Sequence, residues 1–204
     1  AEIMRDGMVQ EKDIPHFADN IHKEAGRLMS LVNDILKLSR LEDIDTQPRE
    51  NVLLELSALC QDVMKRLSLQ AAKQDISLIF EGEPVQIMGV RTTVEEIVYN
   101  VCDNAIKYGK PGGWVRITTG TAQGKAFISV RDNGIGIPLA DQERIFERFY
   151  RVNKSHSKEV GGTGLGLSIV KHAMMLMGGE ITLNSTFGEG TELTLLFMAN
   201  EPVS

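Results

Sequence analysis

The sequence predicts an α+β fold: a two-layer α/β sandwich with a mixed sheet backed by helices, preceded by the remnant of a helical hairpin. After residue 50, short strand-like runs and amphipathic segments follow one another without the regular βα alternation of a parallel sheet. Before it, Ile21, Leu28 and Ile35 recur seven positions apart in an otherwise polar segment, which is typical of a helical bundle. The expected organisation is a hairpin segment at 1–44, a linker at 45–50 and one mixed domain at 51–200.

The first 50 residues predict two helical pieces and a linker. Residues 1–9 have the pattern of a helix end, and Pro15 can lie in the first turn of the next helix. The segment from His16 to Leu41 predicts a helix with a narrow apolar stripe, which favours a helix hairpin. Packing of this helix on its own domain remains the alternative. The charged stretch that follows, with Pro48, predicts the linker.

The remaining residues predict strands and helices whose limits are marked by glycine and proline turns. Strands are expected at Val52–Leu54, Ile76–Phe80, Val85–Met88, Trp114–Thr119, Ala126–Arg131, Glu180–Asn184 and Thr191–Met198. Helices are expected at Leu56–Leu69, from a cap at Thr93 through Ile106, and from a glycine-rich loop to Met177.

Composition excludes several classes of partner. The net charge is −6 and no lysine or arginine stripe alternates with aromatic residues, so a nucleic-acid partner is not expected. No apolar run approaches 18 residues, so any membrane contact would need segments outside this sequence. Cys60 and Cys102 lie in apolar helical patterns without metal-ligand spacing, which indicates reduced thiols and a cytoplasmic location.

The most informative stretch is a glycine-rich loop followed by a helical apolar pattern. Glycines let backbone N–H groups approach a ligand, and a helix beginning there turns its positive dipole end toward an anion. The loop therefore predicts a phosphate cradle, with an ordinary flexible loop as the alternative. It is not a P-loop, because no Gly-Lys-Ser/Thr follows. The loop runs Gly161, Gly162, Thr163, Gly164, Leu165, Gly166, Leu167 and Ser168.

Two further patterns carry possible chemistry. Asp132 directly follows a strand and precedes Gly134 and Gly136; its carboxylate could accept from an exocyclic amine, although a plain Asx turn is the alternative. Asn100 and Asn104 share a helical face with the amine at position 107, a set suited to a hydrated Mg²⁺ and phosphate. A solvated polar face is the alternative for this helix.

In this order and spacing, the three patterns resemble the nucleotide-binding boxes of the sensor histidine kinases. These enzymes belong to the superfamily that includes DNA gyrase, the ninety-kilodalton heat-shock chaperone and the MutL proteins. The resemblance covers 51–198 as the catalytic ATP-binding domain and 1–42 as the last piece of the dimerisation and phosphotransfer hairpin.

The resemblance implies roles for individual residues. Asn100 and Asn104 would hold Mg²⁺, Asn100 and Lys107 would act in catalysis, and Asp132 would bind the adenine amine. Phe146 and Phe149 match a phenylalanine box, and Gly188–Thr191 matches a third glycine box. The expected ATP-binding residues are Asn104, Lys107, Tyr108, Asp132, Gly134, Gly136, Ile137, Phe149, Arg151, Gly162, Thr163, Gly164, Leu165, Gly166, Leu167 and Thr191.

The family's reaction is transfer of the ATP γ-phosphoryl group to a histidine on the hairpin, for relay to a response regulator aspartate. The resemblance therefore implies a protein-histidine kinase, with ATP and Mg²⁺ as cofactors. Its expected partners are a response regulator receiver domain and a second protomer bound through the hairpin. The polar segment Arg151–Val160 resembles the family's ATP lid.

One departure concerns the phosphoacceptor, which in the family is a histidine followed by an acidic residue. His16, His22, His156 and His172 are not followed by one. We therefore expect the acceptor upstream of Ala1 and no self-phosphorylation of this fragment. A superfamily ATPase, an anti-sigma-factor-type serine kinase and a nucleotide-sensing scaffold remain alternatives. Hydrolysing relatives carry a glutamate where this chain has Asn100, Glu96 lies a turn earlier, and Asp103 is expected on another face.

Overall fold

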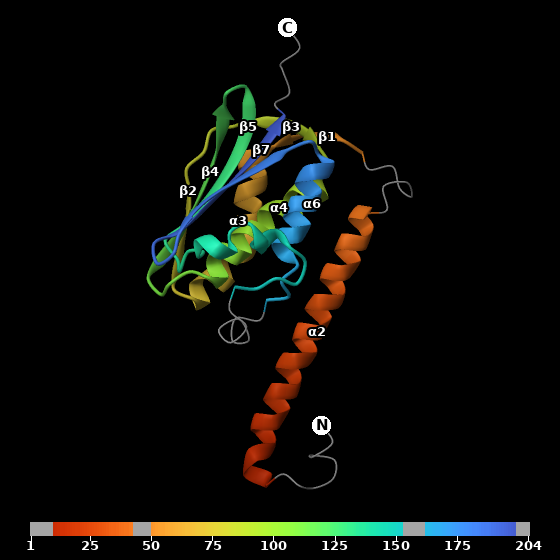
Figure 1. The fold of residues 1–204 in the computed structure, drawn as a ribbon, viewed down its shortest axis with the longest axis vertical. Helices are drawn as coiled ribbons and strands as arrows, with labels where there is room; N and C mark the ends of the chain where they lie inside the picture. The colour runs from red at the N-terminus through yellow and green to blue at the C-terminus, as the bar shows by residue number, and fades with distance from the viewer. Residues whose placement is uncertain (1–9, 43–49, 153–161, 199–204) are drawn as a thin grey trace.

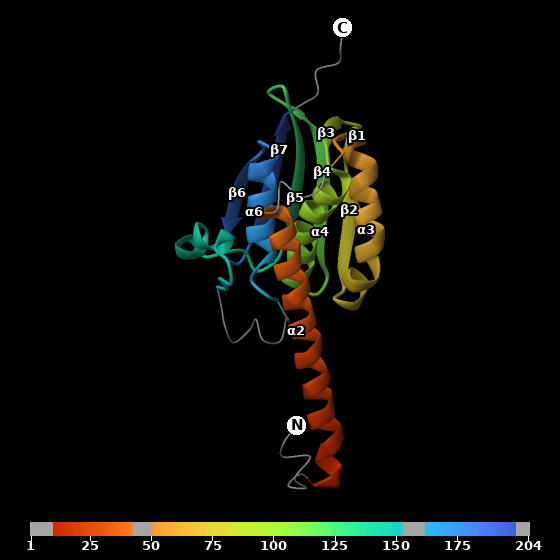
Figure 2. The same ribbon diagram turned by 90° about the vertical axis from the view of Figure 1, so that its right-hand side faces the viewer.

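The computed structural model describes residues 10–42, 50–152 and 162–198. A five-stranded sheet forms one layer, and helices α3, α4 and α6 lie side by side across one of its faces (Figure 2). A long helix, α2, extends away from these layers (Figure 1). The predicted α+β sandwich is therefore confirmed.

The elements follow the predicted order with small differences at their ends. The helices are α2 (Ile14–Glu42), α3 (Leu56–Lys73), α4 (Arg91–Lys107) and α6 (Gly166–Leu176). The strands are β1 (Val52–Glu55), β2 (Ile76–Phe80), β3 (Gln86–Gly89), β4 (Gly113–Ala122), β5 (Lys125–Asp132), β6 (Glu180–Thr186) and β7 (Gly190–Met198). Short 3₁₀ helices lie at Glu11–Asp13, Leu139–Asp141 and Arg144–Phe146.

The main sheet has the strand order β2-β4-β5-β7-β6. The β2–β4 pair is parallel and the other three pairs are antiparallel, while β1 and β3 form a separate antiparallel pair. Alternate residues of β5 face the helices, so Ala126, Ile128 and Val130 are buried. At the end of β5, Asp132 pairs with Thr191 of β7. This register places the two residues side by side, where β5 ends and β7 begins.

The core lies between the sheet and the helical layer. Helix α4 contributes Val94, Ile97, Val101 and Ile106, which are almost fully buried, while α6 contributes Ile169. Burying an aliphatic side chain of this size stabilises a fold by about 1.5–3 kcal/mol. Apolar packing against the sheet therefore holds both helices in place.

One predicted helix cap is wrong. The sequence predicts Thr93 as the N-cap of α4, whereas the helix begins at Arg91 and its N-cap is Val90, which forms no side-chain capping bond. The Thr93 N–H group donates to the Val90 carbonyl at 3.0 Å, so this threonine lies inside the first turn. Helix α3 has a true side-chain cap, because the Glu55 carboxylate accepts from the N–H groups of Ser57 and Ala58.

Helix α2 contacts the domain near its C-terminal end, where it lies beside α6 (Figure 1). There Leu38 is buried and Leu31 packs against the core, whereas Ile21, Leu28 and Ile35 remain exposed. The heptad stripe is thus free along most of the helix. The predicted division into hairpin, linker and domain stays a prediction, since residues 1–9 and 43–49 lie outside the described residues. Within 10–42, 50–152 and 162–198, the helices lack a stretch that combines the length and the hydropathy of a membrane span.

Candidate functional site

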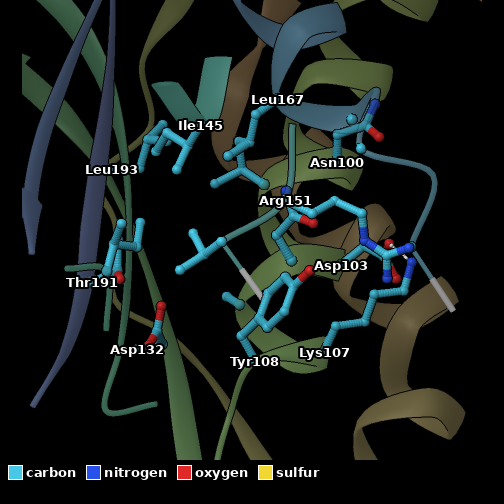
Figure 3. Close-up of a pocket in the computed structure, with 18 of the residues that line it drawn as sticks. Asn100, Asp103, Lys107, Tyr108, Asp132, Ile145, Arg151, Leu167, Thr191 and Leu193 are labelled. Carbon is cyan, nitrogen blue, oxygen red and sulfur yellow. Dashed lines mark ion pairs between the residues drawn. The ribbon is translucent and has the colours of Figure 1, made fainter. Parts of the chain in front are cut away.

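A cavity of about 850 Å³ opens between α4, the end of the sheet where β5 ends and β7 begins, and the glycine-rich loop before α6 (Figure 3). Its volume lies in the range of small-molecule sites, which is roughly 300–1,000 Å³. Polar side chains gather at its two ends, and apolar ones lie between them. The lining includes Asp34, Lys37, Asn100, Asp103, Asn104, Lys107, Tyr108, Val130, Asp132, Ile135, Gly136, Ile137, Ile145, Tyr150, Arg151, Gly162, Thr163, Gly164, Gly166, Leu167, Thr191 and Leu193.

Helix α4 supplies the first polar end. Asn100, Asn104 and Lys107 all line the cavity, as their spacing on one helical face predicts. Asn100 is only 8% exposed, and its Nδ2 donates to the Glu96 carbonyl and to Glu96 Oε1 at 2.8 and 2.9 Å. Both amide hydrogens are used in these bonds, so the Asn100 Oδ1 oxygen is left for the cavity.

Asp103 also lies at this end, contrary to the expectation that it occupies another face. It lines the cavity, and its Oδ2 is 2.6 Å from Lys107 Nζ, an i,i+4 ion pair (Figure 3). Its other oxygen accepts from Gln70 Nε2 of α3 at 2.7 Å. The carboxylate therefore fixes the Lys107 amine at the cavity wall, beside Arg151 (Figure 3).

Asp132 and Thr191 form the opposite polar end (Figure 3). Burial raises the pKa of the Asp132 carboxyl above its ordinary value of 3.8, while bonds from the backbone N–H groups of Gly134 and Thr191 and the charge of Lys110 oppose this rise. Gly134 N donates to Asp132 Oδ1 at 2.8 Å, which fixes the carboxylate. A half-buried acceptor with few protein donors can receive an amine N–H of a ligand.

The turn after Asp132 requires its glycines. A Cβ at Gly134 would lie 2.4 Å from the Tyr108 carbonyl oxygen. Gly136 has φ of +64°, and a Cβ there would lie 2.0 Å from the Thr186 carbonyl oxygen. The next residue on the wall, Ile137, donates its N–H to Ser185 Oγ at 2.9 Å. The Asx turn is therefore real, and it also forms a wall of the cavity.

The glycine-rich loop forms the wall beside Asn100. Gly164 has φ of +76°, and a Cβ there would lie 2.9 Å from the Phe149 backbone. Gly166 begins α6, and a Cβ on it would lie 3.1 Å from Asn100 Oδ1. The first N–H groups of a helix have no partner within it, so α6 presents donors and a positive dipole end to this part of the cavity. The phosphate cradle stays a prediction, which the position of this helix end favours.

Three expected ATP-binding residues do not line the cavity. Phe149 is 59% exposed and has a φ of +64°, and its N–H donates to the Gly164 carbonyl. Leu165 is fully buried in the core. Gly134 contributes its backbone N–H, which donates to the Asp132 carboxylate in the turn. The segment expected to be a lid falls mostly on 153–161, outside the described residues.

Helix α2 adds contacts that the sequence did not reveal. Thr163 Oγ1 of the glycine-rich loop donates to Asp34 Oδ2 at 2.6 Å, and Lys37 Nζ is 2.7 Å from Glu96 Oε1. The partners are 129 and 59 positions apart in the chain, so no local pattern could have indicated them. The alternative that this helix packs on its own domain is therefore correct for its C-terminal part.

The chain matches the family model described as "Histidine kinase-, DNA gyrase B-, and HSP90-like ATPase" over residues 89–201, more than half of its length. Sensor histidine kinase WalK of Bacillus subtilis (strain 168) is 33% identical over 198 residues, which cover 95% of this chain and 32% of WalK. Sensor histidine kinase RppB of Synechocystis sp. (PCC 6803) is 36% identical over 195 residues, covering 95% of this chain and 43% of RppB. The chain therefore spans less than half the length of either relative.

A solved structure shares both the fold and part of the sequence. Full-length ShkA in complex with AMPPNP superposes with a TM-score of 0.75 and 27% identity, over 89% of this chain and 38% of ShkA. Because so much of this chain is covered, the likeness takes in most of the α+β domain. The resemblance inferred from the sequence is thus confirmed. The chain belongs to the histidine kinase-, DNA gyrase B- and HSP90-like ATPase family and corresponds to the catalytic ATP-binding domain of sensor histidine kinases.

Proposed function

We propose that this chain binds Mg-ATP and transfers the γ-phosphoryl group to a histidine on a dimerisation hairpin, for relay to a response regulator. One observation carries the proposal: Asp132 and Asn100 lie at opposite ends of one cavity with apolar side chains between them. Adenine would lie at the Asp132 end, where a carboxylate accepts from its amine. The phosphates would lie at the α4 end, against the glycine-rich loop.

The residues at the phosphate end fit a magnesium ion and three phosphate groups. Amide oxygens of Asn100 and Asn104 are hard ligands of the kind that Mg²⁺ takes, and they would hold it there. When bound, Mg²⁺ supplies neutralisation of phosphate charge. Lys107, held by Asp103, and the N-terminus of α6 add positive charge toward the same place. Phosphoryl transfer depends mainly on this positioning and charge stabilisation.

The same residues favour a kinase over an ATPase. A water nucleophile needs a general base, whereas a histidine nitrogen brings its own lone pair. Asn100 carries an amide where the hydrolysing relatives have a glutamate, and an amide takes no proton. Glu96 lies a turn away, with Oε1 engaged by Lys37 and Asn100. Transfer to a protein side chain is therefore favoured over hydrolysis.

The proposal includes partners. His16 and His22 lie on α2 and lack the acidic neighbour of a phosphoacceptor, so the acceptor is expected on a hairpin that carries both helices. The exposed apolar stripe of α2 fits a second protomer. A receiver domain would accept the phosphoryl group from the hairpin, and the kinase would work in the cytoplasm.

A transfer assay tests the proposed function. The chain would be incubated with ATP labelled at the γ-phosphate and with a separately produced two-helix hairpin that carries an acidic-flanked histidine. We expect label on the hairpin that is labile in acid and stable in base, and no label when that histidine is changed to glutamine. Label on a serine, stable in acid, would replace the proposal with a serine kinase. Label on His16 or His22 of the chain itself would overturn the assignment of α2.

A further inference from the structure

We propose that Glu96 is a positioning residue that turns the Asn100 amide oxygen toward the phosphate end of the cavity, and that Lys37 of α2 holds Glu96 in place. The inference rests on the proposed function, because it concerns how Asn100 meets a metal-bound nucleotide. Glu96 lies one helical turn before Asn100 on α4 and is half-buried.

The hydrogen bonds of Asn100 give its amide one orientation. Its two N–H groups have two acceptors on one residue, the Glu96 carbonyl at 2.8 Å and Glu96 Oε1 at 2.9 Å. If the amide were flipped, its oxygen would face two acceptor oxygens, and two polar contacts would become repulsive. The oxygen is therefore directed the other way, toward Gly166, where the lack of a side chain leaves it accessible.

Lys37 connects this arrangement to α2. Its amine is 2.7 Å from the same Glu96 Oε1 that receives Asn100, and 3.9 Å from Asp34 Oδ1. Asp34 in turn accepts from Thr163 of the glycine-rich loop at 2.6 Å. One turn of α2 therefore contacts both walls of the phosphate end. The position of this helix is linked to the orientation of the metal-holding amide.

The arrangement predicts an effect on metal-dependent binding and not on binding in general. Without the Glu96 carboxylate, Asn100 keeps one acceptor, the backbone carbonyl, and its amide can turn. An amide that is turned part of the time offers its oxygen to the metal less often. The adenine end, formed by Asp132 and Thr191, is untouched. Affinity for ATP without metal should stay the same.

The test is calorimetric titration of ATP into the chain, once with Mg²⁺ and once with a chelator. It gives the factor by which Mg²⁺ tightens ATP binding, which is the dissociation constant without metal divided by the constant with it. Glu96→Ala should reduce this factor about three- to tenfold, the value of one net hydrogen bond. Glu96→Gln keeps an acceptor oxygen for Asn100 and should restore the factor to within about twofold. Lys37→Met should reduce it by a smaller amount.

The matched control is Glu95→Ala. Glu95 precedes Glu96 on the same helix and forms an ion pair with Arg91 at 2.8 Å. Glu95→Ala therefore removes one ion-paired negative charge, as Glu96→Ala does. Its magnesium factor should equal that of the unmodified chain, and thermal melting of each variant would exclude unfolding. A Glu96→Ala factor equal to that of the control would overturn the role of Glu96. An unchanged factor in Lys37→Met alone would overturn the link to α2. No ATP binding by the unmodified chain would instead reject the proposed function.

Discussion

Asp132 is expected to favour nucleotide binding and to disfavour folding. Its carboxylate lies where an adenine amine would arrive, yet burial raises its pKa, which means that the folded chain disfavours the charged form. The backbone N–H of Gly134 offsets only part of this cost. A residue that is unfavourable for folding and well placed for a ligand is typical of binding sites.

Replacing Asp132 with asparagine should therefore weaken nucleotide binding. Asparagine can present a donor to the adenine amine and leave it poorly paired, at a cost of about 1–3 kcal/mol. Calorimetric titration with Mg-ATP measures the change, and Asp62→Asn on the exposed part of α3 is the control. Equal affinities for Asp132→Asn and the unmodified chain would remove Asp132 from the adenine site.

The same substitution should change how stability depends on pH. A carboxyl whose folded pKa is raised contributes stability below its ordinary pKa of 3.8, and this contribution is lost as pH rises through the raised folded value. Asparagine does not titrate. The unfolding free energy of Asp132→Asn relative to the unmodified chain should therefore increase as pH rises from below 3.8 through the raised folded pKa. Urea unfolding across this range measures it, and a difference independent of pH would contradict the raised pKa.

A side chain should cost more at Gly136 than at Gly124, because two effects act there together. Gly124 has φ of +75° and open space where a Cβ would lie, so alanine there should cost only backbone strain, about 1–2 kcal/mol. Alanine at Gly136 adds a close contact with the Thr186 carbonyl and should cost about 1–3 kcal/mol more. Urea unfolding of both variants separates the two effects, and equal losses would show that the turn can shift.

At the scale of elements, α2 leaves an apolar stripe exposed, while its last turns contact the domain. Leu28 is 55% exposed and Ile35 is 46% exposed. Such a stripe favours association with a second helix of the same kind. Because this helix is expected to be half of a hairpin, the association of the chain with itself should be weak.

Leu28→Glu should weaken that association further. Burial of a leucine contributes about 1.5–3 kcal/mol, and the residue would be lost from both protomers, so the dimer dissociation constant should rise at least about tenfold. Leu69→Glu is the matched control, since Leu69 is 67% exposed on another helix, α3. Sedimentation velocity over a range of concentrations measures both. Equal weakening by the two substitutions would show that association does not use the α2 stripe.

Elements with a strong local pattern are predictable from the sequence. Strand β2 and the glycine-rich loop are examples, because a short apolar run and a cluster of glycines are signals carried by neighbouring residues. The cap prediction at Thr93 is wrong because threonine also fits a first turn, and the helix extends back through Arg91 and Thr92. The Asp103–Lys107 pair could have been found, since the spacing is i,i+4.

Other parts of the site depend on tertiary packing. The bond between Asp34 and Thr163 joins segments 129 positions apart and has no signal in either segment. Phe149 matches a phenylalanine box, yet its backbone is left-handed and its side chain is mostly exposed. Neither position follows from neighbouring residues, so only the structure could place these side chains.

At the scale of the whole molecule, the sheet and the helical layer hold two chemically different ends of one cavity in fixed relation. Asp132 is the last residue of β5, while Asn100 lies on α4, and apolar packing between the strand and the helix fixes their separation. Helix α2 contacts the phosphate end from outside the sandwich. In the proposed function this arrangement binds and orients a nucleotide, and Asn100 supplies no base for water.

The rate of ATP hydrolysis by the unmodified chain distinguishes a histidine kinase from an ATPase. Saturation with Mg-ATP would first be established by titration of the same sample, so that slow turnover could not reflect empty sites. We expect bound nucleotide with turnover far below the ordinary enzyme range, because the Asn100 amide takes no proton from water and Glu96 is engaged by Lys37. Sustained turnover of about 1 s⁻¹ or faster would contradict the histidine kinase mechanism and identify the chain as an ATPase.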